Sequence, residues 1–307
     1  MKRFHNLGRQ IWSRRWIYLM FLPALVLYIL FVYVPGYGAI LAFKDLNYNL
    51  GIMKSPWAAN NGMAHFIALF RDAEFWRACV NTVIISLGRI IIEFPMPIIL
   101  SLMLNELFNR KYKKIIQTIL TFPHFISWVI LSGIFLSLLS GSGVINQMIT
   151  ALGGQEVNFL TNSSSFRWLL YATNIWKEAG WSSIIYLAAI AAINPELYSA
   201  AYVDGAHRGQ VIRYITLPAI ISVIGVMFIL AISNMMNAGF DQVFNMYNGA
   251  VMTTSDIIDT YVYRKTFITG INFSMSTAAG LFKSTINLLL LLIANAIVKK
   301  STGKGIY

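Results

Sequence analysis

The chain has 307 residues, of which 57% are hydrophobic, and its mean hydropathy is +0.62. Soluble domains contain about 45–50% apolar residues, so this composition excludes an ordinary soluble protein and indicates a membrane protein. The net charge of +12 could suggest a nucleic-acid partner, but the sequence has no basic–aromatic RNA-binding motif, and we expect none. The single cysteine, Cys79, excludes an intrachain disulfide.

Six apolar runs are long enough to cross a bilayer, which takes about 20 helical residues. The first run is too long for a signal peptide and lacks a cleavage site, so we expect it to be retained as a helix. No stretch between the runs is large enough for a separate folded domain. The sequence therefore predicts an all-α polytopic membrane protein with a single domain over residues 1–307. The predicted spans are roughly 16–43, 79–107, 115–139, 166–193, 217–237 and 277–298.

The basic residues indicate how these spans are oriented. They gather in residues 1–15, in the short loop at 110–114, in the connection 194–218 and after residue 298. Because cytoplasmic loops carry an excess of Lys and Arg, we expect both termini and the connection 194–218 to be cytoplasmic. The long connection 238–276, which contains a helical pattern over 255–267, is then extracellular.

The connection 194–218 reads as a bent pair of short helices. Pro195 suits the first turn of a helix, where its missing N–H has no partner to lose. Asp204-Gly205 predicts a bend in which Gly205 supplies backbone freedom and Asp204 caps the second helix. In that helix Val211, Ile212 and Ile215 share one face. Such a rigid element can pass a push from a soluble partner into the membrane.

Charged residues inside the spans need partners or water, because an ionisable group in the bilayer costs at least about 2.5–3.5 kcal/mol. Arg89 and Glu93 lie four residues apart and can pair along one helix face. Lys177 is similarly deep, and we expect Glu178 to point away from it toward another neighbour. Lys283 is less deep. These residues indicate either a hydrated solute pathway or ion pairs that fix helix packing.

A further group of polar and aromatic residues offers what a sugar site needs. Amides and carboxylates can bind hydroxyls, and flat rings can cover the C–H face of a sugar. The same residues also fit interface aromatics and helix-terminal amides. The members are Asn234, Asn237, Asp241 and Gln242 with Trp128, Trp176 and Trp181.

We expect no catalytic residue, metal or cofactor in this chain. It has no P-loop, so it cannot hydrolyse ATP by that route. No spacing of His, Cys and carboxylates suggests a metal site. His124, next to Pro123, is expected to satisfy a kinked backbone.

The connection 194–218 resembles the EAA loop of type I ABC importer permeases. Ser199 stands where that pattern has its leading glutamate, and Glu196, one helical turn earlier, offers a carboxylate instead. The matching positions are Ala200, Ala201, Asp204, Gly205, Ala206, Ile212, Ile215, Leu217 and Pro218. The resemblance implies contact with an ATPase through these residues together with Glu196, Ser199 and Arg208.

Four other segments are similar to the carbohydrate-uptake branch of these permeases, of LplB type and related to the maltose permeases. They are 21–24, 81–82, 122–123 and 256–264. The resemblance implies the type I ABC importer permease fold in the cell membrane, with oligosaccharide as the substrate. It also implies a second homologous permease, two ATPase subunits that bind ATP and Mg, and an extracellular solute-binding lipoprotein.

Several alternatives stay open at this point. The solute could be a peptide or a polyol, and the cations at Arg89, Lys177 and Lys283 also admit an acidic saccharide. A secondary carrier would need no ATPase. A membrane-embedded sensor or scaffold would keep the loop but would move no solute.

Overall fold

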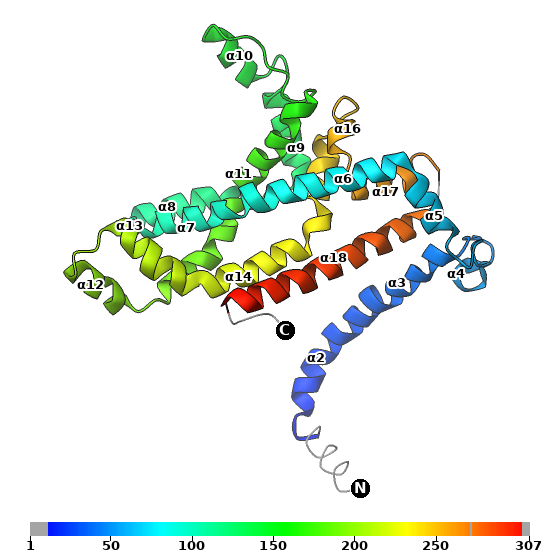
Figure 1. The fold of residues 1–307 in the computed structure, drawn as a ribbon, viewed down its shortest axis with the longest axis horizontal. Helices are drawn as coiled ribbons and strands as arrows, with labels where there is room; N and C mark the ends of the chain where they lie inside the picture. The colour runs from blue at the N-terminus through cyan, green and yellow to red at the C-terminus, as the bar shows by residue number, and fades with distance from the viewer. Residues whose placement is uncertain (1–11, 271, 303–307) are drawn as a thin grey trace. The chain divides into compact units, whose positions relative to one another are not determined.

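A computed structural model describes residues 12–270 and 272–302, and its regular elements over these ranges are helices (Figure 1). The chain divides into two compact units. The first comprises the residues up to 71 together with 270–281, and the second comprises 72–269 together with the residues from 282 onward.

Four helices are long and apolar enough to cross a membrane, and two bent helix pairs raise the number to six when each pair counts as one span. The expectation of an all-α protein with about six spans is therefore confirmed. The straight spans are Arg15–Phe43, Ala73–Asn105, Arg208–Ser233 and Phe273–Lys300, and the bent pairs are Arg110–Phe125 with Trp128–Leu138 and Ser163–Ala191 with Pro195–Val203.

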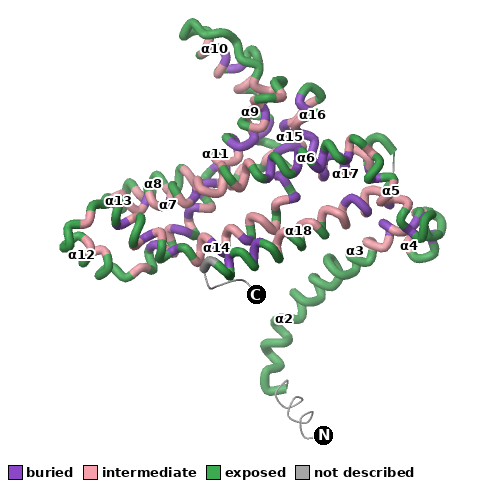
Figure 2. Tube along the Cα trace, viewed as in Figure 1, coloured by how far each residue is buried: buried purple, intermediate pink, exposed green. Residues whose placement is uncertain are grey.

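In the first unit, a long helix leads into a small folded segment. None of the residues of α2 or η1 is buried, and Figure 2 shows this stretch exposed along its length, so its apolar side chains require lipid or protein around them. Ser274 then fastens the start of α18 to the segment, because its hydroxyl donates to the Lys44 carbonyl at 2.7 Å. The elements are α2 (Arg15–Tyr28), η1 (Ile29–Tyr33), α3 (Val34–Gly36), η2 (Tyr37–Phe43), α4 (Gly51–Lys54), α5 (Ala64–Arg71) and the start of α18 (Phe273–Thr302).

The second unit is a helical bundle whose core is built by α6, α11 and the segment that follows α14. Residues 238–257 are part of this core, since Val243, Met246 and Ile257 pack with Phe166 and Leu170 of α11. In Figure 1, α12 lies at the left end of the unit and α17 at the right end. The elements are α6 (Ala73–Gly88), η3 (Arg89–Glu93), α7 (Pro95–Asn105), α8 (Arg110–Thr121), η4 (Phe122–Phe125), α9 (Trp128–Leu138), α10 (Val144–Ala151), α11 (Ser163–Ala191), α12 (Pro195–Val203), α13 (Arg208–Val211), η5 (Ile212–Thr216), α14 (Leu217–Ser233), η6 (Met235–Asn237), α15 (Phe240–Met246), α16 (Met252–Ser255), α17 (Ile258–Phe267) and the rest of α18.

The predicted third span, 115–139, is broken in two, because the chain bends by 101° between Phe125 and Trp128. The helix tightens into a 3-10 turn that contains Pro123. Ile126 then leaves the helical region, with φ −85° and ψ 131°. Ser127 caps the new helix by accepting the Ile130 N–H at 3.4 Å. A proline and a capping serine a few residues apart thus end one helix and begin the next.

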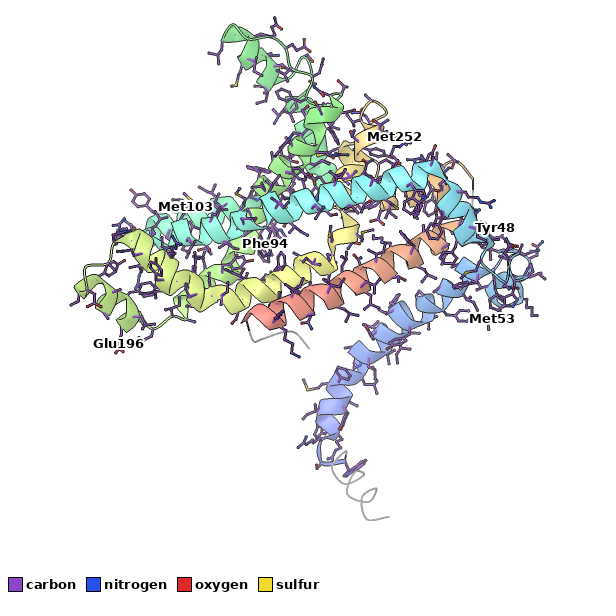
Figure 3. The ribbon with its side chains drawn as sticks, in the orientation of Figure 1. Tyr48, Met53, Phe94, Met103, Glu196 and Met252 are labelled. Carbon is purple, nitrogen blue, oxygen red and sulfur yellow. The ribbon has the colours of Figure 1, made fainter. Side chains whose placement is uncertain are left out.

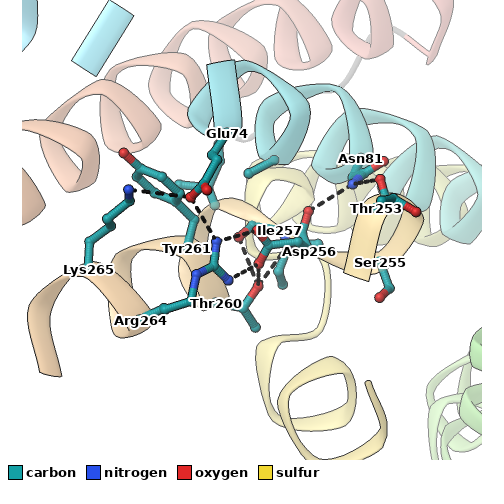
Figure 4. Close-up of polar contacts among 12 residues, drawn as sticks. Glu74, Asn81, Thr253, Ser255, Asp256, Ile257, Thr260, Tyr261, Arg264 and Lys265 are labelled. Atoms are coloured by element: carbon teal, nitrogen blue, oxygen red, sulfur yellow. Dashed lines mark hydrogen bonds and ion pairs between the residues drawn. The ribbon is translucent and has the colours of Figure 1, made fainter. Parts of the chain in front are cut away.

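A buried carboxylate anchors α17 to α6 (Figure 4). The Asp256 residue is fully buried, and its carboxylate accepts hydrogen bonds from both terminal nitrogens of Arg264 at 3.0 and 2.8 Å. The Thr260 hydroxyl donates a third bond at 2.7 Å. The Asp256 carbonyl accepts from the Asn81 side chain of α6 at 3.1 Å. Two segments that the sequence singled out by resemblance, 81–82 and 256–264, therefore meet at one buried ion pair.

A second layer of contacts fixes the start of α6. The Tyr261 hydroxyl donates to the Asp72 carboxylate at 2.7 Å, and Lys265 lies 3.4 Å from it. Burial opposes ionisation of Asp72, but the Tyr261 hydroxyl, the Glu74 backbone N–H and the Lys265 charge together hold the pKa of Asp72 below its ordinary value. The side-chain hydrogen bonds to Asp256 raise the pKa of Arg264.

We predict that Asp256→Ala lowers the free energy of unfolding by about 3–5 kcal/mol, because it removes both hydrogen bonds from the mostly buried Arg264 guanidinium and leaves it only Glu74, 3.5 Å away. Thermal unfolding can be followed by thiol labelling of Cys79, which is buried and is the single cysteine. Glu74→Ala is the matched control. The Glu74 side chain is 46% exposed and its cations lie 3.3 and 3.5 Å away, so we expect a loss below about 1 kcal/mol. Equal shifts in the two variants would contradict the assignment of Asp256 as the anchor.

Candidate functional site

The second unit contains three neighbouring cavities of about 400, 490 and 330 Å³. The first cavity lies among α6, η3, α7, α11, α14 and the turn after α14. The second lies at the bend between η4 and α9, and the third lies beside the start of α15. Each shares lining residues with the other two, so the three cavities adjoin one another. The first and third cavities share Arg89, Asn174, Asn237 and Gly239. The second and third share Trp128 and Asp241, and the first and second share Glu178.

The pair predicted at Arg89 and Glu93 forms, and both side chains line the first cavity. Their nearest charged atoms, Nη1 and Oε2, lie 3.5 Å apart, and the two side chains are 17% and 12% exposed. Arg89 Nη2 also donates to Gln242 Oε1, and the Asn174 amide donates to Glu93 Oε2. The pair therefore ties η3 to both α11 and α15.

The turn between η6 and α15 is shaped to meet Arg89. Ala238 and Gly239 both have left-handed backbone angles, with φ of 45° and 73°. A Cβ at Gly239 would overlap the Arg89 guanidinium, so only glycine fits there. Gln242, one turn further, is 1% exposed and donates to the Leu170 carbonyl and the Thr173 hydroxyl, both at 2.7 Å.

The expectation that Glu178 points away from Lys177 is wrong. The Lys177 ammonium lies 3.0 Å from the Glu178 carboxylate and donates to the His124 carbonyl at 2.6 Å. The other Glu178 oxygen pairs with His124 Nδ1 at 2.7 Å. The bend after Pro123 places His124 beside α11. The flexible Lys177 side chain can then reach both the His124 carbonyl and the Glu178 carboxylate.

The prediction that His124 satisfies a kinked backbone is wrong, because its ring pairs with Glu178 and its backbone carbonyl is satisfied by Lys177. The ring stacks on the Trp181 indole with centroids 4.5 Å apart and planes 2° apart. Within residues 12–270 and 272–302, no group of three or more His, Cys, Asp or Glu side chains could hold a metal ion.

The cavities bring together most of the residues that the sequence singled out for a pathway, namely Arg89, Glu93, Trp128, Lys177, Asn234, Asn237 and Asp241. Three others do not line them. Trp176 packs edge-on against Phe135 at 5.7 Å, and Trp181 covers His124. Lys283 binds Asp259 at 2.6 and 2.7 Å, and Asp259 lines the third cavity.

The sequence analysis missed a polar stripe on α11. Asn174, Glu178, Ser182 and Tyr186 are spaced every four residues and all line the first cavity. This spacing places them on one helix face, so it was readable from the sequence. Ser86 also lines the cavity, one turn before Arg89.

The connection 194–218 forms the predicted bent pair of helices, with one difference. The Asn194 side chain caps α12 by accepting the Glu196 N–H at 3.0 Å, and Gly205 has φ 78°. Asp204 ends α12 and does not cap α13. The cap is His207, which forms a capping box with Gln210, because the chain turns through Ala206 before the second helix begins.

The outer helix α12 presents its surface outward and is braced at its base. It has no buried residue, and Figure 3 shows Glu196 near its start. The Tyr198 hydroxyl contacts the Thr216 hydroxyl at 3.2 Å. The Arg208 guanidinium lies 3.8 Å from Glu106 and 5.1 Å from the Phe108 ring centroid, in the connection after α7. These contacts connect α12 to η5 and α13 to the segment that follows α7.

Residues 93–303 match the family model described as "Binding-protein-dependent transport system inner membrane component". The chain belongs to this family. It is 44% identical over 296 residues to the polygalacturonan/rhamnogalacturonan transport system permease protein YteP of Bacillus subtilis, covering 96% of this chain and 91% of that protein. It is 41% identical to the LplB protein of the same organism, over 95% of this chain and 91% of that one.

A solved structure has the same fold along nearly the whole chain. It is a bacterial ABC transporter involved in the import of the acidic polysaccharide alginate, with a TM-score of 0.88 and 39% identity, covering 97% of this chain and 99% of that one. A second structure shows the bacterial alginate transporter in complex with an alginate pentasaccharide-bound periplasmic protein, at the same TM-score and 38% identity, over 98% of this chain and 100% of that one. The predicted family and permease fold are confirmed.

We predict that Gly239→Ala slows solute uptake by the reconstituted transporter. An alanine at this position has to adopt the left-handed backbone angles despite its Cβ, and the Cβ displaces the Arg89 guanidinium. Together the two effects cost about 1–3 kcal/mol. Gly133→Ala in α9 is the control, because a Cβ at Gly133 meets open space. If uptake and thermal stability are equal in the two variants, the fit of Arg89 against the turn is not required.

Proposed function

We propose that this chain is the permease subunit of an ATP-driven importer for oligosaccharides, and that acidic oligosaccharides are its substrates. The observation that carries the proposal is the set of three adjoining cavities, which combines amides, ion pairs and aromatic faces inside a bundle of membrane length. Relatives at 44% and 39% identity are named for polygalacturonan/rhamnogalacturonan and for alginate. Their names support an acidic saccharide.

In the proposed mechanism, the cavities open alternately to the two sides of the membrane. A solute-binding lipoprotein delivers the saccharide at the extracellular end, and a second homologous permease completes the pathway. Two ATPase subunits bind ATP and Mg and close on each other at the cytoplasmic end. Their closure moves α12, and the braced base of α12 passes the movement to η5, α14 and α7.

The proposed topology puts both termini and α12 in the cytoplasm. The positive-inside rule supports this orientation, as does the position of α12 at the end of the second unit opposite α17. In this topology the connection 238–276 faces the extracellular side, where the binding protein docks.

We predict that Gly205→Pro abolishes uptake and the ATP hydrolysis stimulated by the loaded binding protein, because proline cannot adopt the φ of 78° at this bend. Asp204→Lys tests the same surface by reversing a charge beside the bend. Gly153→Pro is the matched control, since Gly153 has φ 84° and lies near α10, far from α12 in the chain. Full uptake and stimulated hydrolysis in a normally assembled Gly205→Pro complex would show that the loop does not couple ATP use to transport.

We also predict that cysteines at Gly249 and Ala250, both exposed, crosslink to the binding protein from the extracellular side. A cysteine at Ser199, also exposed, should react only from the cytoplasmic side. The native Cys79 is buried and gives a low background. Binding-protein crosslinks at Ser199, or labelling of Gly249→Cys only from the cytoplasm, would overturn the topology.

A further inference from the structure

The helix α8 has two sides of opposite character. Four polar residues recur at intervals of three or four positions, so they lie together on one side, which we call the polar face. The polar face consists of Lys114, Gln117, Thr118 and Thr121. Its side chains are exposed or partly exposed. The other side carries isoleucines, of which Ile115 and Ile119 are 55% and 65% exposed.

A helix of this kind can turn only one of its sides to lipid. The helix α8 belongs to a bent pair that is apolar enough to cross the membrane as one span. Isoleucine side chains are stable in lipid, whereas a charged side chain in the bilayer costs at least about 2.5–3.5 kcal/mol. No residue of α8 is buried against the rest of the described chain. The polar face therefore meets water or another molecule.

The polar face lines a fourth cavity, of about 380 Å³, together with Phe122, Phe125 and Ile184. Phe125 also lines the second cavity, so the two cavities adjoin. The segment just before α8 contacts Arg208 of α13, through Glu106 at 3.8 Å. The polar face thus leads from the second cavity toward the end of the second unit that carries α12 and α13.

The charge of the fourth cavity differs from that of the second. In the second cavity, Lys177 is accompanied by the carboxylates of Glu178 and Asp241. Among the described residues that line the fourth cavity, Lys114 carries the single charge. No ion pair within residues 12–270 and 272–302 includes Lys114. The fourth cavity is therefore positive and the second is not.

The two threonines of the polar face present acceptors beside this cation. The Thr118 and Thr121 hydroxyls donate to backbone carbonyls one turn earlier, at 2.9 and 2.6 Å. Their hydrogens are thus engaged, and their oxygens remain able to accept from a ligand. Hydroxyl acceptors that end at an unpaired ammonium suit a molecule that carries both hydroxyls and carboxylates.

We propose that the polar face of α8 lines the solute path between the second cavity and the α12 end of the unit, and that Lys114 favours acidic saccharides there. This inference rests on the proposed function and makes it more specific. The carboxylates of the second cavity repel a uronate, and Lys114 attracts it. The difference draws an acidic saccharide from the second cavity toward the α12 end, which is the cytoplasmic side in the proposed topology.

The first arm of the test measures which side of α8 meets water. The complete transporter, with the partner permease, the ATPases and the binding protein, is placed in lipid nanodiscs and treated with a charged methanethiosulfonate. Thr118→Cys and Ile119→Cys are compared, because both positions are exposed and adjacent in the chain, and the native Cys79 is buried. A thiol reacts as the thiolate, which lipid suppresses, so we expect labelling at Thr118→Cys to be about tenfold faster or more. Equal rates, or faster labelling at Ile119→Cys, would overturn the inference.

The second arm measures whether Lys114 acts on the charge of the solute. Uptake of trigalacturonate and of a methyl-esterified form with one charge less is compared in proteoliposomes. The ratio of the two rates is measured for wild type, Lys114→Gln and Lys114→Arg. Lys111→Gln is the matched control, because Lys111 is exposed on the same helix and lines none of the four cavities. Preference by the binding protein enters every ratio equally and cancels between variants.

We expect Lys114→Gln to lower the preference for the more charged saccharide by about two- to fivefold, the effect of one ion pair in a wet environment. Lys114→Arg and Lys111→Gln should keep the wild-type ratio. An unchanged ratio in Lys114→Gln would overturn the role of Lys114. An equal loss of uptake for both saccharides, seen only with anionic phospholipid in the membrane, would overturn it in favour of a lipid headgroup site. Failure of the wild type to import trigalacturonate would overturn the acidic substrate of the proposed function and with it the role of Lys114, while the labelling result would still decide whether the polar face meets water.

Discussion

The bidentate ion pair between Asp256 and Arg264 is the interaction on which the arrangement of the second unit depends. Asp256 is fully buried and lies just before α17, and Arg264 lies within α17. The backbone carbonyl of the same residue accepts from Asn81 of α6, so the segment that carries the pair is held against a membrane span. Because residues 238–257 belong to the core, the position of the Gly239 turn depends in part on this anchor.

Two ion pairs of the bundle differ in how fully their polar atoms are hydrogen-bonded. Asp256 is satisfied by Arg264 and Thr260 at normal hydrogen-bond distances. Arg89 and Glu93 are only partly satisfied and border a cavity. A fully satisfied buried pair fixes a conformation, whereas a partly satisfied one carries a cost that a ligand can remove.

The end of the second unit that carries α12 follows a different physical rule. The helix α12 buries none of its residues, and its stability comes from local capping at Asn194 and from the turn at Gly205. Such an element keeps its shape without a core of its own and leaves its surface free for a partner. Contacts from Tyr198 and Arg208 at its base connect it to the bundle.

The sequence by itself determined the features that depend on neighbouring residues. Hydropathy indicated six spans, because crossing a bilayer requires a continuous apolar run. The pairing of Arg89 with Glu93 was predictable, since residues four apart meet on one helix face. The bent pair of helices at 194–218 was readable from its proline and glycine, although its cap was assigned to Asp204 and lies at His207.

Only the tertiary structure decided which distant groups meet. The bend after Pro123 brings His124 to Glu178, 54 positions later in the chain, and so closes the cluster with Lys177. The Gly239 turn meets Arg89 because residues after α14 fold back into the core. These contacts join segments far apart in the chain, and no local pattern specifies them. They form because a charge inside a membrane must find its partner within the folded bundle, where water cannot supply one.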